Sequence, residues 1–97
     1  MKKFHELKLL DKYYQDVVVK RTKQFEIRKN DRDFQVGDIV SFTNVDGKNR
    51  PHKSYFLITY VLKDIPEYGL HKDYCIFGIK WIYDVVEGRR KWMMLKI

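Results

Sequence analysis

The sequence predicts a single small α+β domain with five to six β-strands and one N-terminal helix. The chain has 97 residues, which is enough for one hydrophobic core and too few for two. Hydrophobic residues make up 44% of the chain and aromatic residues 15%, as is typical of folded globular proteins. Several runs of β-branched and aromatic residues alternate with turn-forming residues, whereas one early segment has helical spacing. We therefore expect residues 1–97 to form one domain.

The first strand and the helix are expected at the start of the chain. Residues 5–10 alternate in polarity, which favours a short strand. Asp11 then stands where a helix N-cap is expected. The apolar residues of the helix recur at helical spacing: Tyr13, Tyr14, Val17 and Val18. We expect the helix to end near Lys20 or Arg21, since basic side chains suit the negative end of a helix dipole.

The most informative segment, residues 23–38, combines a strand with an unusual density of charge. Phe25 and Ile27 alternate with Glu26 and Arg28. In a strand of period two, this pattern predicts that the apolar pair faces the core and that the charged pair shares the opposite face. Two charged side chains on one face of a half-buried strand are a candidate for a site.

A charged loop and a second turn are expected after this strand, at residues 29–33 and 36–38. Four polar residues are assigned to closing these turns: Asn30, Asp31, Asp33 and Asp38. Phe34, which lies between the two turns, is expected to pack in the core.

The second half of the chain is rich in strands. Four runs are expected to be extended: residues 39–44, 55–62, 74–83 and, after a turn at 87–88, 90–97. Residues 55–62 are hydrophobic almost throughout, which predicts burial on both faces or a central place in a curved or closed sheet. A loop is expected between the second and third runs, because Pro66 lacks an N–H donor and Gly69 permits a left-handed turn.

Several classes of function are disfavoured by the sequence. Its five glycines are scattered, which is unlike a phosphate-binding loop or a dinucleotide fingerprint. We expect no metal and no cofactor, because His5, His52 and His71 are isolated from other ligand types. Cys75 has no partner for a disulfide and is expected to be a small core residue. With no apolar run near the ~20 residues that span a bilayer, we expect no membrane association and a cytoplasmic protein.

The charge balance favours a polyanionic partner. Twenty Lys and Arg residues against 13 Asp and Glu residues give a net charge of +7. Residues 20–32 hold six basic and two acidic side chains, so an excess of four of these charges is local. A second basic cluster near the C-terminus either extends the same face or favours solubility: Arg89, Arg90 and Lys91.

The chain resembles a known family in several of its motifs. The most specific is FEIRKNDRDF at residues 25–34, within the charged segment 23–38. Residues 5–8 (HELK), 65–70 (IPEYGL) and 77–80 (FGIK) accompany it. Together they resemble a small bacterial and phage family of unknown function within the ASCH/PUA-like superfamily, over roughly residues 5–81.

The resemblance implies a PUA-like fold, with a curved, barrel-like sheet, a helix beside it and a cleft next to the connection between helix and strand. Members of the wider superfamily bind, or are proposed to bind, RNA. The Lys-x-x-Glu-x-Arg pattern of the ASCH branch corresponds to Lys23, Glu26 and Arg28, and in that branch it lines the cleft. A related ASCH branch is an amidohydrolase that deacetylates acetylated cytidine. It implies catalytic roles for Lys23, for Glu26 in place of a Thr, and for Glu67 in a shortened insertion.

A lysine, a carboxylate and an arginine around one cleft suit a ligand that carries both a phosphate and a nucleobase. Arg28 can donate to phosphate oxygens or to a base edge, and Glu26 can accept from an exocyclic amine. Lys29, Asn30 and Arg32 are expected at the rim. Tyr68 is favoured over Tyr55 and Tyr74 as a stacking surface, because it lies in a loop. The structural alternative is that Glu26 pairs with Arg28, or that Arg32 and Asp31 join such a pair, to fix the loop.

Three functional hypotheses follow. The first is a module that binds RNA or a modified nucleotide through Lys23, Glu26 and Arg28. The second is a small amidohydrolase in which Lys23 is the reactive base and Glu26 or Glu67 moves the proton. The third is a non-catalytic domain that binds another protein through its β surface. The sequence leaves the identity of the ligand and the oligomeric state open.

Overall fold

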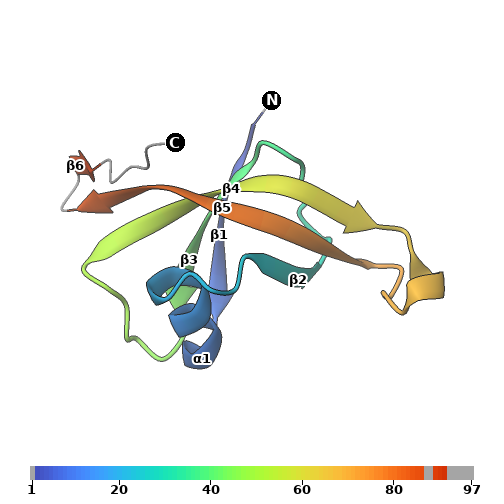
Figure 1. Cartoon of the computed structure of the whole chain (residues 1–97), viewed down its shortest axis with the longest axis horizontal. Coiled ribbons are helices and arrows are strands. Elements are labelled where there is room, and N and C mark those ends of the chain that lie inside the picture. The colour runs from blue at the N-terminus through green and yellow to red at the C-terminus, as the bar shows by residue number, and fades with distance from the viewer. Residues whose placement is uncertain (1, 87–88, 92–97) are drawn as a thin grey trace.

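The chain folds into a small α+β domain, in agreement with the predicted class (Figure 1). The computed structural model describes residues 2–86 and 89–91. The elements in chain order are β1 (Phe4–Leu9), α1 (Asp11–Tyr14) with a following π-helical turn (Gln15–Val19), β2 (Phe25–Lys29), β3 (Ile39–Asn44), β4 (His52–Lys63), a 3₁₀ turn (Pro66–Tyr68), β5 (Tyr74–Val86) and β6 (Arg89–Lys91). Within the described ranges, no helix is long and apolar enough to span a membrane.

The six strands that the structure describes belong to one mixed sheet with the order β1-β3-β4-β5-β2, and β6 pairs with β5. Only β1 and β3 are parallel; the other pairs are antiparallel. The long β4–β5 hairpin crosses the whole molecule, and register shifts interrupt its pairing after Tyr55 and after Ile58 (Figure 1). β4 therefore has the central place that its hydrophobic sequence predicted.

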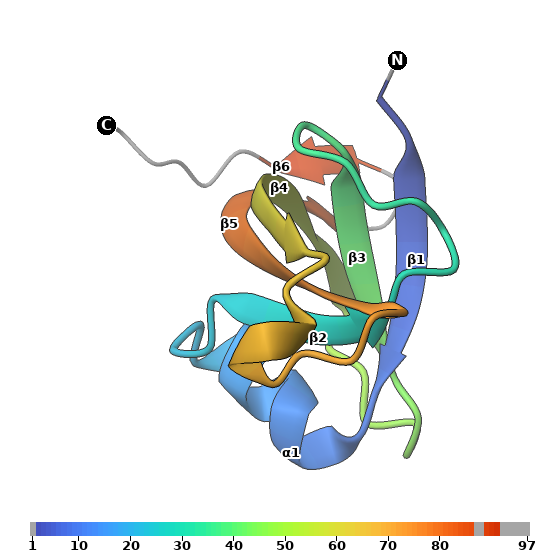
Figure 2. The ribbon, with the colours of Figure 1, turned by 90° about the vertical axis from the view of Figure 1, so that its right-hand side faces the viewer.

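The sheet is curved but not closed. Its terminal strands, β1 and β2, come close together without forming a ladder, as the view in Figure 2 shows. The expected curved sheet is therefore present, whereas closure into a barrel is corrected to an open sheet. The gap between the two terminal strands is where the candidate site lies.

The hydrophobic core lies between the inner face of the sheet and the helical segment. Val17 and Val18 from the π-helical turn belong to the same buried cluster as Phe34 and Phe77, whose ring centroids lie 4.8 Å apart. Cys75 is also fully buried, and burial raises the pKa of its thiol. The predictions of Phe34 and Cys75 as core residues are confirmed.

The predicted orientation of β2 is wrong. Phe25 is 44% exposed and Ile27 is 53% exposed, whereas Glu26 is only 4% exposed. A period-two pattern fixes which residues share a face, but it does not say which face is inside. Here the inward face carries the charged residues, because their partners lie inside the fold.

Of the two alternatives for residues 55–62, burial on both faces is not observed, because burial alternates along β4, where Tyr60 is 64% exposed. The expected helix N-cap needs correction. Asp11 is the first helical residue rather than a side-chain N-cap. Its carboxylate instead accepts hydrogen bonds from Gln15 and from Asn44, at 3.1 and 2.9 Å.

The remaining boundaries agree with expectation where the structure describes them. The helical segment ends at Val19, next to the predicted Lys20. Residues 64–69 form a loop around the 3₁₀ turn, and Gly69 adopts the left-handed conformation with φ of 93°. The predicted turn at 87–88 and most of the predicted strand 90–97 lie outside the described residues; β6 covers only Arg89–Lys91.

A buried hydrogen-bonded carboxylate joins β1 to the loop before β3. Asp38 is 1% exposed and accepts from His5 Nε2 at 2.8 Å. It also accepts from the backbone N–H groups of Lys3 and Gln35, each at 3.1 Å. Burial alone would raise the pKa of Asp38, but these hydrogen bonds outweigh it and lower the pKa. Asp38 therefore does more than close a turn, since it also joins the loop to β1. Asn30 closes its turn as expected, because its side chain accepts from Phe34 N–H.

Asp38→Ala is expected to lower the free energy of unfolding by about 2–4 kcal/mol at neutral pH, because three donors lose a buried acceptor. The pKa of Asp38 is lowered in the fold, relative to about 3.9 in an unfolded chain. Its ionised form therefore stabilises the fold above that value, and this stability is lost as the pH falls through the folded-state pKa. Urea denaturation at pH 7 and at about pH 3 should show the difference between wild type and variant narrowing at the lower pH.

Asp73→Ala is the matched control, because Asp73 is an exposed carboxylate. It should change the free energy of unfolding by less than about 0.5 kcal/mol. If Asp38→Ala unfolded at the same urea concentration as Asp73→Ala, the structural role of Asp38 would be refuted.

Candidate binding cleft between β1 and β2

The candidate site begins with the open edge of β1. The carbonyls of Lys3 and Leu9 accept from β3 and the residue after it, so the odd-numbered residues of this parallel strand direct their peptide groups to β3. The peptide groups of Glu6 and Lys8 therefore face the gap toward β2. In that gap, Arg28 Nη2 donates to the carbonyl of Lys8 at 2.7 Å. Two strands that do not pair are thus linked by a side chain.

Arg32, in the loop that follows β2, makes a second link to β1, because its Nη1 donates to the carbonyl of Glu6 at 3.1 Å. The two guanidinium groups satisfy carbonyls that a strand ladder would satisfy in a closed barrel. They keep β1 and β2 apart by the length of an arginine side chain. The space between the strands stays open because side-chain hydrogen bonds take the place of a backbone ladder.

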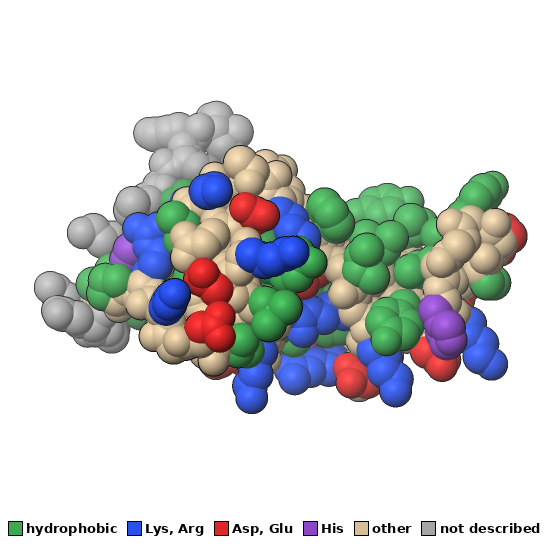
Figure 3. All heavy atoms as spheres, turned by 90° about the horizontal axis from the view of Figure 1, so that it is seen from below, with side chains coloured by type: hydrophobic (Ala, Val, Ile, Leu, Met, Phe, Trp, Pro, Cys, Tyr) green, Lys and Arg blue, Asp and Glu red, His purple; other side chains and the backbone are tan. Residues whose placement is uncertain are grey.

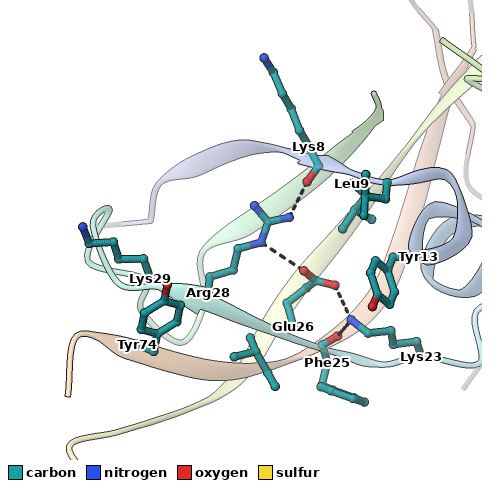
Figure 4. Close-up of a pocket in the computed structure, with 11 residues that line it drawn as sticks. Lys8, Leu9, Tyr13, Lys23, Phe25, Glu26, Arg28, Lys29 and Tyr74 are labelled. Carbon is teal, nitrogen blue, oxygen red and sulfur yellow. Dashed lines mark hydrogen bonds and ion pairs between the residues drawn. The ribbon is translucent and has the colours of Figure 1, made fainter. Parts of the chain in front are cut away.

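The centre of the cleft is a buried carboxylate held by two cations (Figure 4). The side chain of Glu26 is 5% exposed, and its Oε1 accepts from Arg28 Nε at 3.1 Å. Its Oε2 accepts from Lys23 Nζ, and the same ammonium group donates to the carbonyl of Phe25 at 2.8 Å. Glu26 therefore fixes the positions of both cations.

The two cations keep donors for a ligand. The described contacts of Arg28 use Nε and Nη2, so Nη1 remains as a donor. Those of Lys23 use two of its three ammonium protons, so one proton remains. Both side chains are partly exposed, at 24% for Arg28 and 20% for Lys23. A ligand oxygen in the cleft can thus reach donors that are already oriented.

The walls of the cleft combine positive charge with aromatic rings. The cleft has a volume of about 500 Å³. Its charged lining consists of Lys8, Lys23, Arg28 and Lys29 against Glu26, an excess of four minus one, or three positive charges. Tyr13 and Tyr74 also line it, and the ring of Tyr13 lies 5.5 Å from Lys23 Nζ. Such a lining suits a planar anion better than a cation or an apolar ligand.

A smaller hollow of about 190 Å³ lies beside Arg28 and is also lined by Lys29, Asp31 and Arg32. Arg28 lines both hollows, so its guanidinium group stands where the two meet. The basic character of the cleft therefore continues past Arg28 along the gap. Among the residues that the structure describes, no three His, Cys, Asp or Glu residues are arranged to hold a metal ion.

The structure brings together four of the candidate residues from the sequence: Lys23, Glu26, Arg28 and Lys29. Arg32 lines the adjoining hollow, and Asn30 uses its side chain to close the loop. The pairing of Glu26 with Arg28, which was the structural alternative, is present in the same arrangement. The residues that line the candidate cleft, Glu26 and Arg28, are therefore also the residues that form the predicted structural pair.

Other candidates lie elsewhere. Tyr68 is 81% exposed on the 3₁₀ turn and does not line the cleft. Glu67, from the same turn, is also exposed and absent from the lining, so the second carboxylate of the amidohydrolase hypothesis is not beside Lys23. Tyr55 stacks on Tyr83 with 5.1 Å between ring centroids. For Arg89, Arg90 and Lys91 the structure describes the backbone of β6 but not the side chains.

The sequence did not predict that Lys8, Leu9, Leu10 and Tyr13 line the cleft, and Phe25 and Ile27, which were expected in the core, line it as well. Tyr13 was assigned to the apolar face of the helix, but it is 37% exposed, whereas its neighbour Tyr14 is buried. Adjacent residues on a helix point about 100° apart, so one of the two tyrosines had to leave the core face. Lys8 contributes through its backbone position, and nothing local indicates that β1 lies next to β2.

Fold and site together define a small α+β domain with an open curved sheet and a basic, aromatic cleft between its terminal strands. The chain belongs to the family described as a domain of unknown function (DUF3850), whose model matches residues 4–79. The match includes every residue that lines the cleft. No curated protein matches the chain.

A double-mutant cycle should show that Glu26 and Arg28 are coupled. We expect Glu26→Gln, Arg28→Gln and the double variant to give an interaction energy of roughly 1–3 kcal/mol, because the pair is largely removed from water. Urea denaturation of the four proteins measures it.

The matched control is the exposed pair Glu6 and Lys53, whose atoms lie 2.9 Å apart and whose side chains are 59% and 35% exposed. Solvent screening should keep the coupling of this pair below about 1 kcal/mol. Equal coupling in both pairs would show that burial gives the Glu26 cluster no special strength.

Proposed function

We propose that this protein is an RNA- or nucleotide-binding module whose cleft holds a phosphate group and an adjoining base. One observation carries the proposal: buried Glu26 holds Lys23 and Arg28 in place while each retains a free donor toward the cleft. Cations whose geometry is already fixed lose little conformational entropy when they bind an anion. Arginine in particular matches the geometry of phosphate oxygens.

The rest of the lining supports the same ligand. Tyr13 and Tyr74 offer ring faces of the kind on which unpaired bases stack. Lys8 and Lys29 are exposed at the rim, where they attract a polyanion from solution. Glu26 has a different role from the one that the sequence suggested. Because both of its oxygens already accept from cations, it serves as a positioning residue rather than as an acceptor for a base amine.

The arrangement favours binding over hydrolysis. Lys23 acts as a donor in both of its contacts, to Glu26 and to the carbonyl of Phe25. A lysine that abstracts a proton must instead present a lone pair to its substrate. With Glu67 outside the cleft, no second carboxylate from that turn is present to move a proton.

Binding of a fluorescein-labelled single-stranded RNA octamer should be salt-dependent and should weaken when the rim lysines are removed. We expect Lys8→Ala and Lys29→Ala each to reduce the affinity by roughly threefold to tenfold. Each should also lower the slope of log K against log salt by about 0.7, the value for one phosphate contact with a single strand. Fluorescence anisotropy between about 50 and 200 mM salt measures both quantities.

Lys48→Ala is the matched control, because Lys48 is an exposed lysine that does not line the cleft. It should leave affinity and slope nearly unchanged. No binding at the lowest salt concentration would end the proposal. Equal losses in all three variants would mean that the RNA responds to the overall charge of +7 and not to the cleft.

A further inference from the structure

The outer face of the sheet carries an apolar surface that begins at Phe25 and Ile27, which also line the cleft, and continues beyond the cleft across β5 and β4. Its positions follow from the strand register, in which Phe25 pairs with Gly78 and Gly78 with Tyr60 across β2, β5 and β4. The next row pairs Ile27 with Ile76 and Ile76 with Leu62. We call these six residues the outer platform: Phe25, Ile27, Tyr60, Leu62, Ile76 and Gly78.

The outer platform is exposed rather than part of the core. Tyr60 is 64% exposed and Leu62 is 36% exposed, in addition to the exposed Phe25 and Ile27. Outward positions of a sheet that has one face in water are usually polar. Figure 3 shows hydrophobic side chains gathered over the half of the molecule that carries β2 and the projecting end of the β4–β5 hairpin. Apolar outward residues on three adjacent strands are therefore an exception that calls for an occupant.

Gly78, in the middle of the outer platform, leaves a shallow depression because it has no side chain. A Cβ atom at residue 78 would lie 3.2 Å from Thr59 Oγ1, which is closer than most such contacts. Adjacent strands lie about 4.8 Å apart, so Phe25 and Tyr60 flank this glycine at roughly 10 Å from one another. Two rings separated in this way can each take the face of a different base of one strand.

The charges around the outer platform select a polyanion. On β2 and β5, the outward positions that flank the platform are Lys29 and Tyr74 at one end and Lys80 at the other. None of these flanking residues carries a carboxylate. A second copy of the chain that packed face to face would bring lysines toward lysines, which disfavours self-association. Unpaired RNA combines phosphates with flat apolar bases and therefore matches both properties of the surface.

The outer platform is continuous with the cleft through Phe25. The carbonyl of Phe25 accepts from Lys23 inside the cleft, whereas its ring lies on the other side of β2 from Glu26 (Figure 4). The ammonium group of Lys23 lies 4.6 Å from the centroid of that ring. One cation thus stands at the border between the two surfaces.

We propose that the outer platform is a second binding surface, on which single-stranded RNA stacks its bases against Phe25 and Tyr60 after leaving the cleft. The idea rests on the proposed function, since the cleft holds the phosphate from which the strand continues. It adds a path across β2, β5 and β4 and a preference for unpaired RNA, because paired bases do not offer their faces.

The experiment compares two ligands and three kinds of variant. The ligands are a single-stranded RNA octamer, followed by anisotropy, and cytidine 5′-monophosphate, followed by NMR titration. Phe25→Ala and Tyr60→Ala should each weaken binding of the octamer by about tenfold, in line with the loss of one stacked base. Tyr60→Ala should not change the affinity for the mononucleotide, because Tyr60 does not line the cleft, whereas Phe25→Ala should weaken it as well, because Phe25 does. Arg28→Gln should weaken the binding of both ligands.

Phe4→Ala is the matched control, because Phe4 is an exposed phenylalanine of β1 outside both surfaces. It should leave both affinities unchanged, and circular dichroism should show that every variant keeps its fold. If the mononucleotide binds but Tyr60→Ala binds the octamer like wild type, the outer platform is refuted and the cleft stands. If neither ligand binds, the proposed function fails and the outer platform fails with it. A dimer in sedimentation that Tyr60→Ala dissociates would assign the surface to a second copy and overturn the inference.

Discussion

The arrangement of this domain depends on one interaction, the carboxylate of Glu26 held between Lys23 and Arg28 inside the gap of the sheet. A carboxylate whose side chain is 5% exposed is stable only where hydrogen-bond donors compensate for its lost hydration, and at Glu26 these donors are two cations. The two donors lie on the same side of β2, so that side must face inward. Because strand residues alternate, Phe25 and Ile27 must then face outward. One ion cluster thus determines both the charge of the cleft and the apolar character of the outer face.

The same cluster explains why the sheet stays open. A strand edge that faces another edge at close range usually pairs with it, since unpaired backbone groups are costly when water is excluded. Here Arg28 and Arg32 donate to the carbonyls of Lys8 and Glu6, which removes much of the drive toward pairing. A side chain that is longer than a backbone hydrogen bond holds the strands apart. The cleft is therefore built into the sheet and needs no insertion or separate domain.

Much of the fold could be predicted from local sequence, whereas the site could be predicted only in part. β3 follows the β-branched run at 39–44, and the loop at 64–69 follows from Pro66 and Gly69, because these signals act within a few residues. The charged spacing also indicated which side chains of β2 act together. It could not show that they point inward, because the deciding contact joins Arg28 to a carbonyl twenty residues earlier in the chain. For the same reason Asp38 resembled an ordinary turn residue until its partner, His5, was placed beside it.

Glu26 neutralises part of the positive charge of the cleft, yet it makes the cleft better suited to binding an anion. Without Glu26, Lys23 and Arg28 would repel each other and adopt many conformations, and a ligand would have to order both. With Glu26, the cleft keeps an excess of three positive charges, and its central donors have defined directions. The cost appears on the other side of β2, where apolar residues are exposed to water. In the function that we propose, one RNA strand contacts both sides of β2, so the inward orientation of a single glutamate affects the whole binding surface.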